Sequence, residues 1–237
     1  MKTVSIMQPY LFAYLGYYQL LNLSDTFVIL DDVNYIKKGW VNRNRILGQQ
    51  EPLLFTVPLK DASQNRHIKD TYLHESYTIW VNKFNTTLSR TYKKAPHYAK
   101  TKELINAVLG SCVPGDSISK LCLASLKAVI DYLKIKTQLV ETSATYKNQQ
   151  LKGQDRILDI CKQEKTNRYV NLSGGQELYS PQTFEDAGIE LKFHKILKCE
   201  YTQNLPQDFQ AHLSLIDVLM FCSIEQIQEL LQQYEVI

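Results

Sequence analysis

Hydrophobic and polar residues change their spacing twice within the first thirty positions of the chain. Residues 3–7 form a short apolar run that stops at Gln8-Pro9, which predicts a buried strand followed by a loop. Over residues 11–23 the apolar side chains recur at helical intervals, whereas residues 26–30 are apolar throughout and rich in β-branched types. The second run is typical of a strand buried on both faces of a parallel sheet. We therefore expect a strand–helix–strand unit with a right-handed crossover.

The rest of the chain continues to alternate between helical and strand patterns. Helices are expected at residues 77–92, 99–109, 118–133, 155–163, 182–187, 214–221 and 224–234, and strands at 137–141, 168–172 and 190–194. Short strands are expected between residues 39 and 59, including one framed by prolines at 52–58, and an exposed loop at 60–68. These patterns predict an α/β fold with a Rossmann-like core of parallel strands. A single domain is expected over residues 1–237, with a helical insertion at roughly 71–133, because that helix-rich stretch separates two strand–helix–strand regions.

Composition narrows the class of protein without deciding its activity. The chain has 237 residues, of which 44% are hydrophobic and 22% charged, so a sizeable core can form without disulfides or metals. A net charge of +3 is too small to indicate nucleic acid or a membrane surface as partner. The five cysteines lack metal-knuckle or redox spacing and are expected to be reduced and mostly buried. Because no run is apolar enough for a signal peptide or a membrane span, we expect a cytoplasmic protein.

The loop after the first strand is one candidate site. Ligands of open parallel sheets bind outside the carboxyl ends of the strands, where this loop is expected to lie. Gly16 permits close approach of a ligand, and the amino end of the following helix favours an anion. The alternative is a packing turn of proline and tyrosines. The candidate substrate-binding residues of this loop are Gln8, Tyr10, Gly16 and Tyr17.

The segment of residues 31–45 is the stronger candidate, because a wholly apolar strand leads directly into it. Its carboxylates can orient a hydroxyl or an amine, Arg43 offers a bidentate fork for phosphate, and Trp40 can stack on a base or a sugar ring. The alternative is a solvated, self-neutralising hairpin. We assign catalysis to Asp31 and Asp32, and substrate binding to Lys38, Trp40, Asn42, Arg43 and Asn44.

Two later segments add weaker candidates. Ser143 after a strand, together with Arg156 at the start of a helix, provides a hydroxyl and a guanidinium for a polyanion, although Asp155 acting as helix cap with a solvated Arg156 is an equally simple interpretation. Ser173 and Gly174 follow a strand and offer backbone donors, or form only a turn. His97 and His194 are possible general bases that are more often structural. The chain has no HExxH, Walker, GxSxG or GxGxxG motif.

The order and spacing of these motifs resemble the WbqC-like family of bacterial surface-polysaccharide clusters. The likeness starts with Gln-Pro, Gly-Tyr, Asp-Asp-Val, Lys-x-Gly-Trp and Asn-Arg-Asn. At the Asp-Phe-Val of the family, this chain has Thr26-Phe27-Val28. The likeness continues over nearly the whole chain with Leu-Phe-Thr-Val-Pro, Gly-Gln-Asp-Arg, Asn-Leu-Ser-Gly-Gly and Leu-Ser-Leu-Ile-Asp. The first loop is also similar to that of HUP-type nucleotidyltransferases and synthetases. Their HxGH signature corresponds here to residues 14–17, where Tyr14 and Tyr17 replace both histidines. This resemblance implies a HUP-type fold rather than adenylyl transfer.

Together these features predict an enzyme of surface-polysaccharide (O-antigen) precursor synthesis. It would transfer a group on a nucleotide-linked or phosphorylated amino sugar, or on its activated acyl or aminoacyl donor, with Lys38, Arg43 and Arg156 on the phosphate. The alternative is a non-catalytic nucleotide-sugar-binding or scaffold protein of a glycan-assembly complex. The expected partner is a small nucleotide or phosphorylated sugar, with a homodimer or association with glycan-biosynthesis enzymes as possible further contacts. The sequence specifies no metal and no cofactor, and it leaves donor and acceptor open.

Overall fold

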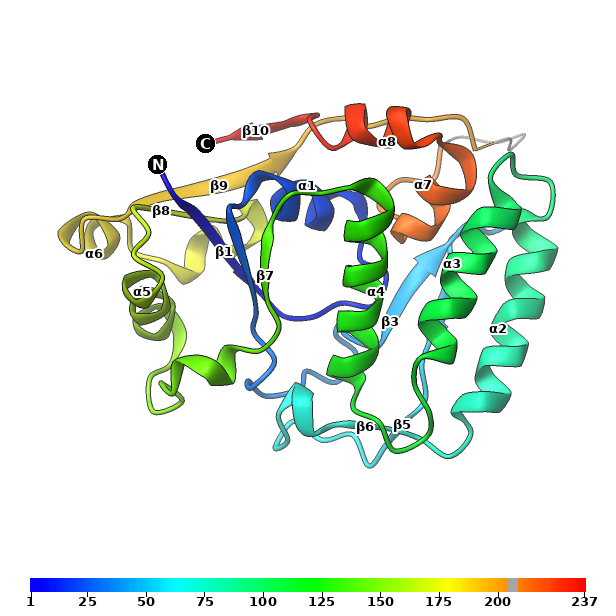
Figure 1. Ribbon diagram of the computed structural model, residues 1–237, viewed down its shortest axis with the longest axis horizontal. Helices are drawn as coiled ribbons and strands as arrows, with labels where there is room; N and C mark the ends of the chain where they lie inside the picture. Colours follow the sequence, from blue (N-terminus) through cyan, green and yellow to red (C-terminus); the bar gives the residue numbers. More distant parts are fainter. Residues whose placement is uncertain (204–208) are drawn as a thin grey trace.

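Five parallel strands and one antiparallel edge strand form the central sheet in the computed structural model, which describes residues 1–203 and 209–237 (Figure 1). The strands are β1 (Thr3–Met7), β2 (Thr26–Ile29), β7 (Gln138–Val140), β8 (Arg168–Leu172), β9 (Glu190–Ile196) and β10 (Tyr234–Val236). Their order across the sheet is β10-β9-β8-β1-β2-β7. The parallel strands thus run outward from β1 in both directions, as in a Rossmann-like fold, and the order reverses between β1 and β8.

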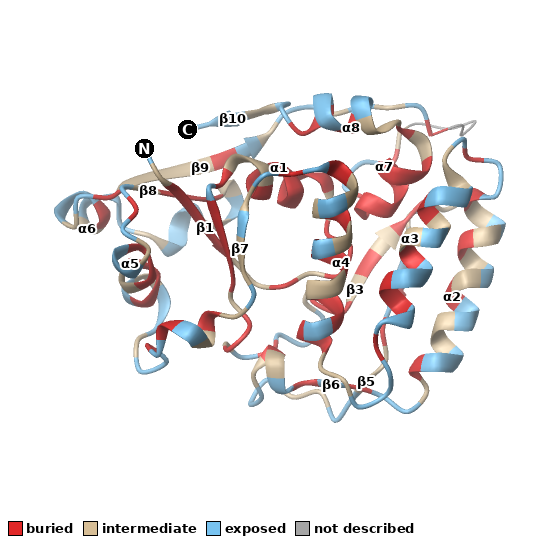
Figure 2. Cartoon of the chain, viewed as in Figure 1, coloured by how far each residue is buried: buried red, intermediate tan, exposed pale blue. Residues whose placement is uncertain are grey.

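Helices cover both faces of this sheet because its strands carry apolar side chains on both sides. In β2, Phe27 and Ile29 pack against α1 (Leu15–Leu23), α4 (Ile118–Leu133), α7 (Leu215–Phe221) and α8 (Ile224–Leu230). Val28, between them, faces the opposite core with α5 (Gly153–Gln163) and α6 (Pro181–Asp186). Buried positions accordingly lie along the strands and on the inner sides of the helices (Figure 2).

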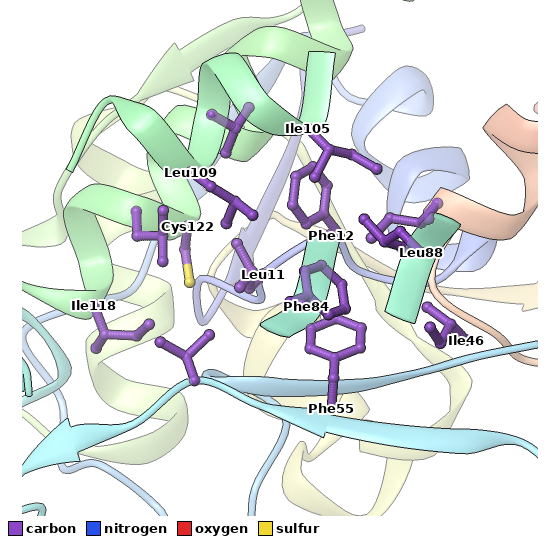
Figure 3. Close-up of a cluster of buried hydrophobic side chains, with 14 of the residues drawn as sticks. Leu11, Phe12, Ile46, Phe55, Phe84, Leu88, Ile105, Leu109, Ile118 and Cys122 are labelled. Atoms are coloured by element: carbon purple, nitrogen blue, oxygen red, sulfur yellow. The ribbon is translucent and has the colours of Figure 1, made fainter. Parts of the chain in front are cut away.

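A third apolar core lies beside the sheet rather than on it. Between β2 and β7 the chain forms the hairpin β3 (Arg43–Ile46) and β4 (Leu53–Thr56), the short pair β5 (Leu59–Lys60) and β6 (Tyr72–Leu73), and the helices α2 (Tyr77–Tyr92), α3 (Tyr98–Gly110) and α4. Phe55 and Phe84 meet here with ring centroids 4.7 Å apart. Leu11 and Phe12 of the first loop also enter this core (Figure 3). The loop is therefore fixed between the sheet and the helical part.

Most predicted elements are present, and two differ in an informative way. The first helix begins at Leu15 instead of residue 11, since Phe12 has a left-handed φ of 42° and packs with Leu11 into the third core. The prediction of helix over residues 231–234 is wrong: α8 ends at Leu230, and β10 then pairs antiparallel with β9, Tyr234 opposite Ile196. Pairing with an exposed sheet edge outweighs the local helical pattern there.

Within residues 1–203 and 209–237, none of the helices combines the length and the apolar character needed to cross a bilayer.

Candidate functional site

A cavity of about 510 Å³ lies at the carboxyl edge of the sheet, where the strand order reverses. We call it the switch-point cavity. Gln8 reaches it from the end of β1, and Asp32 from the end of β2. Arg156 of α5 and Tyr179, which follows β8, complete its walls. Parallel strands place their carboxyl ends at one edge, so residues far apart in sequence converge at this point.

The ion pair of Asp32 and Arg156 is the main polar feature of the switch-point cavity. Arg156 Nη2 lies 2.6 Å from Asp32 Oδ1, and the two residues are only 5% and 3% exposed. Ser143 donates a short hydrogen bond to the same oxygen. Since Ser143 begins the 3-10 helix Ser143–Tyr146 and Arg156 lies in the first turn of α5, the segment after β7 supplies both partners of a carboxylate that follows β2.

These contacts determine the charge of Asp32. Burial by itself would raise the pKa of this carboxyl group, but the hydrogen bonds from Ser143 and Arg156 and the charge of Arg156 outweigh it and hold the pKa below its ordinary value. Asp32 is therefore ionised at neutral pH. Its second oxygen, Oδ2, is buried and accepts no hydrogen bond from the described residues, although the Gln149 side chain is near enough to help lower the pKa. A buried carboxylate oxygen without a donor is uncommon in folded proteins, and a donor from water or a ligand would satisfy it.

The part of the cavity wall formed by the start of α5 favours an anion. Arg156 Nε donates to Asn148 Oδ1 at 3.0 Å, and Asn148 in turn donates to Asp159 at 2.7 Å, so the guanidinium is held in place from behind. The helix α5 begins beside it with Lys152 as N-cap, and no side chain caps the free amides of the first turn. Lys152 and Gly153 both line the cavity. A cation and a helix amino end here attract phosphate or carboxylate.

Asp31 has a different environment from its neighbour. Its carboxylate accepts hydrogen bonds from Ser119 at 2.9 Å and from Thr142 at 2.7 Å, and its carbonyl accepts from the Lys69 amide. The residue is buried, and it does not line the switch-point cavity. Asp31 thus ties α4 and the segment after β7 to the end of β2.

A second cavity of about 250 Å³ lies on the other side of the first loop, and we call it the aromatic cavity. Tyr10, Tyr14 and Trp40 provide its rings, and Arg45 and His212 are its basic side chains. Asn44 also lines it, but its amide group is occupied: Nδ2 donates to the Phe12 carbonyl at 2.8 Å, and Oδ1 accepts from the Arg45 amide at 2.8 Å.

Comparison with known proteins agrees with the motifs. The WbqC-like protein family matches residues 8–229 of the chain. The chain belongs to the WbqC-like family. It is also 26% identical over 220 residues to the uncharacterized protein Rv1507c of Mycobacterium tuberculosis, covering 92% of this chain and 93% of that protein. No solved structure gives a significant match.

This WbqC-like protein divides the predicted site residues among three environments. Gln8, Asp32 and Arg156 line the switch-point cavity, and Ser143 supports it by its bond to Asp32. Tyr10, Trp40 and Asn44 line the aromatic cavity. Neither cavity is lined by the remaining predicted residues, which are Asp31, Gly16, Tyr17, Lys38, Asn42, Arg43, Ser173 and Gly174.

Several of these remaining residues have internal partners. The buried Tyr17 donates its hydroxyl to the Gln8 carbonyl at 2.9 Å, and a β-carbon at Gly16 would lie 2.6 Å from the Tyr14 ring. Asn42 accepts from Tyr35 and donates to Val57. Arg43 donates to the carbonyl groups of Gly39 and Lys38, so its guanidinium stabilises its own hairpin.

Ser173 and Gly174 open the 3-10 helix Ser173–Leu178, and Gly174 is exposed. In the segment that follows β8, only Leu178 and Tyr179 line the switch-point cavity. His97 is the N-cap of α3, and His194 is buried on β9, where burial lowers its pKa to about 4. Neither histidine lines either cavity.

The capping interpretation of Asp155 is wrong. Lys152 is the N-cap of α5, Asp155 is its third residue, and Arg156 is buried rather than solvated. Gly153 has a φ of 51°, which lets the chain turn into the helix two residues earlier than predicted.

The predicted site residues leave out six polar side chains that line the switch-point cavity: Asn34, His67, Gln149, Lys152, Gln154 and Tyr179. The pair Lys152-Gly153 ahead of a helical pattern carried a signal for an anion site, because a helix amino end lies beside a cation there. His67 carried none, since it lies in a polar loop with no periodicity. In the described parts of the chain, no group of three His, Cys, Asp or Glu side chains is placed to hold a metal ion.

Proposed function

We propose that this protein is an enzyme of bacterial surface-polysaccharide precursor synthesis, which transfers a group to or from an amino sugar linked to a nucleotide or a phosphate. One observation carries the proposal: the switch-point cavity places the unpaired Oδ2 of Asp32 beside a buried arginine and an open helix amino end. A ligand that fits must offer both a hydrogen-bond donor to Asp32 and an anion to the start of α5. Phosphorylated sugars and nucleotide sugars have this combination of groups.

The polar groups suggest a role for each wall. Lys152, Arg156 and the first-turn amides of α5 bind the phosphate, since charge-assisted hydrogen bonds to anions are the stronger ones. Asp32 Oδ2 accepts a hydrogen bond from a hydroxyl or amine of the sugar. Because its pKa is lowered, Asp32 is a weak base, and we assign it to orienting the acceptor rather than to deprotonating it.

His67 is the proton acceptor that we assign. It lines the same cavity, and its Nδ1 lies 3.7 Å from the Asp70 carboxylate, which can orient and stabilise the imidazolium. In the transfer, the acceptor oxygen or nitrogen forms the new bond, the bond from the transferred group to its phosphate-bearing leaving group breaks, and the acceptor proton moves to His67. The size of the cavity, about 510 Å³, lies within the range of about 300–1,000 Å³ that holds small-molecule substrates.

A thermal-shift panel of nucleotides, nucleotide sugars and sugar phosphates tests the binding part. At a ligand concentration of 100 times Kd, binding stabilises the folded state by about 2.7 kcal/mol. For a domain of this length that corresponds to a rise in Tm of about 5–10 °C. Lys152→Gln should reduce the shift, whereas the matched control Arg43→Gln should keep it, because Arg43 bonds only to its own hairpin.

Catalysis is tested separately from binding. With a ligand found in the panel, His67→Gln should abolish turnover of the donor while leaving the thermal shift in place. A flat panel, together with co-purification of a glycosyltransferase or aminotransferase, would refute the proposal and favour a non-catalytic scaffold of a glycan-assembly complex.

A further inference from the structure

The aromatic cavity has the features of a ligand site in its own right. Its rings come from two separate segments, Tyr10 and Tyr14 from the loop after β1 and Trp40 from the turn before β3. The hydroxyl groups of both tyrosines and the His212 ring make no hydrogen bond to any residue in 1–203 or 209–237. Burial raises the pKa of Tyr14 to about 12, with a contribution from Tyr10, so the hydroxyl keeps its proton. The walls therefore offer ring faces together with unused polar groups.

Arg45 is the charged group of this cavity, and it has no acidic partner in the described parts of the chain. Its guanidinium carbon lies 5.4 Å from the centre of the Trp40 ring. Its Nε is buried and donates to no described residue. A buried donor without an acceptor is costly unless a ligand or water completes it, and a guanidinium fork matches phosphate and carboxylate best.

The loop that forms the wall of the cavity is held rigidly. Asn44 Nδ2 and Ser214 Oγ both donate to the Phe12 carbonyl, at 2.8 and 2.6 Å. The Leu215 amide donates to the next carbonyl, that of Ala13, at 2.8 Å. These bonds keep Phe12 at its left-handed φ of 42°. Tyr10 and Tyr14 are thus positioned before any ligand arrives, which reduces the entropy lost on binding.

The same loop connects the aromatic cavity to the switch-point cavity. Gln8 lines the latter and Tyr10 the former. Only Pro9 lies between them, so their α-carbons lie within about 7 Å of each other. The Tyr17 hydroxyl supports the Gln8 carbonyl, and the Tyr17 ring lies 5.7 Å from that of Tyr10. Ligands bound in the two cavities would therefore be separated from each other by the three-residue segment from Gln8 to Tyr10.

We infer that the aromatic cavity is a second subsite, which binds a single sugar ring carrying an acidic group, a phosphate or a carboxylate. The apolar CH faces of the sugar pack on Tyr10, Tyr14 and Trp40, the acidic group binds Arg45, and the tyrosine hydroxyls and His212 meet the ring hydroxyls. Its volume of about 250 Å³ is below the usual range for ligand cavities and suits one ring, although it shares Tyr14, Ile196 and His212 with a neighbouring cavity of about 370 Å³. This inference rests on the proposed function, in which a second reactant must lie near the first.

Isothermal titration with glucose 1-phosphate, glucuronate and glucose tests the inference on the full chain. The two acids should bind and neutral glucose should bind far more weakly, and the ratio of the two acids shows whether the site prefers phosphate or carboxylate. Arg45→Gln should weaken binding of the acids by about tenfold or more, because it removes a charge-assisted pair. Arg43→Gln is the matched control, since Arg43 lies at a similar 5.3 Å from Trp40 without lining the cavity, and it should change binding less than about twofold.

A second variant and a second ligand keep the outcomes distinct. Tyr14→Phe removes one hydroxyl and little packing, and it should weaken sugar-acid binding even if Arg45→Gln folds poorly. Lys152→Gln should impair nucleotide binding but leave sugar-acid binding intact.

If Lys152→Gln abolishes sugar-acid binding and Arg45→Gln does not, the ring binds in the switch-point cavity, and the inference is overturned while the proposed function stands. If sugar acids bind through Arg45 but no nucleotide or nucleotide sugar binds at all, the subsite is real and the proposed function fails. Absence of sugar-acid binding refutes the subsite.

Discussion

Two buried carboxylates in this molecule have opposite electrostatic environments. Asp32 pairs with a buried arginine, and its pKa is lowered. Asp217, on α7, is fully buried among neutral donors: Tyr92 and Tyr201 donate to it at 2.8 and 2.7 Å, and Gln203 at 2.8 Å. Burial raises the pKa of Asp217, and the three hydrogen bonds only partly oppose that rise.

The difference separates a site from a structural anchor. Both oxygens of Asp217 have donors, and through Tyr92 the network reaches the Leu47 amide at the end of β3. Asp32, in contrast, borders a cavity and keeps one oxygen without a donor. A perturbed pKa alone would have selected both residues as functional candidates, whereas the unused oxygen selects only Asp32.

Replacing Arg156 with leucine should produce the largest effect. The variant leaves the Asp32 carboxylate buried without its cation, and removal of one partner of a buried pair costs about 3–5 kcal/mol of the free energy of unfolding. Urea denaturation at pH 7 measures this loss. Arg168→Leu is the matched control: its pair with Glu190 is about one-third exposed, so the loss should stay below about 1 kcal/mol. Similar losses for the two variants would contradict the role given to Arg156.

Asp217→Asn should have a smaller effect that depends on pH in the opposite sense to Asp32→Asn. The amide keeps one acceptor but turns two donor hydrogens toward neighbours that are donors themselves, which costs about 1–3 kcal/mol. Because the folded pKa of Asp217 is raised, its stabilising contribution is fully present below the unfolded pKa of about 3.9 and is lost as pH rises through the folded value. The penalty of Asp217→Asn should therefore be larger at pH 4 than at pH 7.

The matching experiment on Asp32 sharpens the comparison. Its folded pKa is lowered, so its contribution is present above about pH 3.9 and is lost as pH falls through the folded value. The penalty of Asp32→Asn should accordingly shrink on acidification. Urea midpoints of both variants and of the wild type, measured from pH 7 to below the unfolded pKa of about 3.9, give the two slopes, and the Asp32→Asn penalty shrinks in the acidic part of that range. Slopes of equal sign would show that the two environments are not opposed.

Arg43→Gln should have the smallest effect. The guanidinium bonds to two carbonyl groups of its own turn and forms no ion pair with a described residue, so we expect the free energy of unfolding to change by less than about 1 kcal/mol. Denaturation and the thermal shift of a bound nucleotide test this together. A loss of nucleotide binding in this variant would indicate that the phosphate binds at Arg43, as the sequence analysis predicted.

The fold was largely accessible from periodicity, and the site only in part. The ranges predicted for α2 and α4 agree with the structure residue for residue, since long amphipathic patterns identify helices well. Gln8 and Asp32 were also identifiable, because polar residues that follow apolar strands collect at the carboxyl edge of a parallel sheet. Arg156 was identifiable as a basic residue at the start of a helix. His67 and Gln149 were not, since they reach the cavity from irregular segments whose path depends on what they pack against.

By itself, the sequence determined most of the elements, their Rossmann-like arrangement and the family, because each of these follows from patterns along the chain. Only the tertiary structure decided which of two adjacent aspartates faces the cavity. Asp31 and Asp32 are chemically identical, but Ser119 and Thr142 bond to the first, and Ser143 and Arg156 to the second. Their partners lie about ninety or more residues away, and no local pattern records which of two neighbouring side chains will meet them.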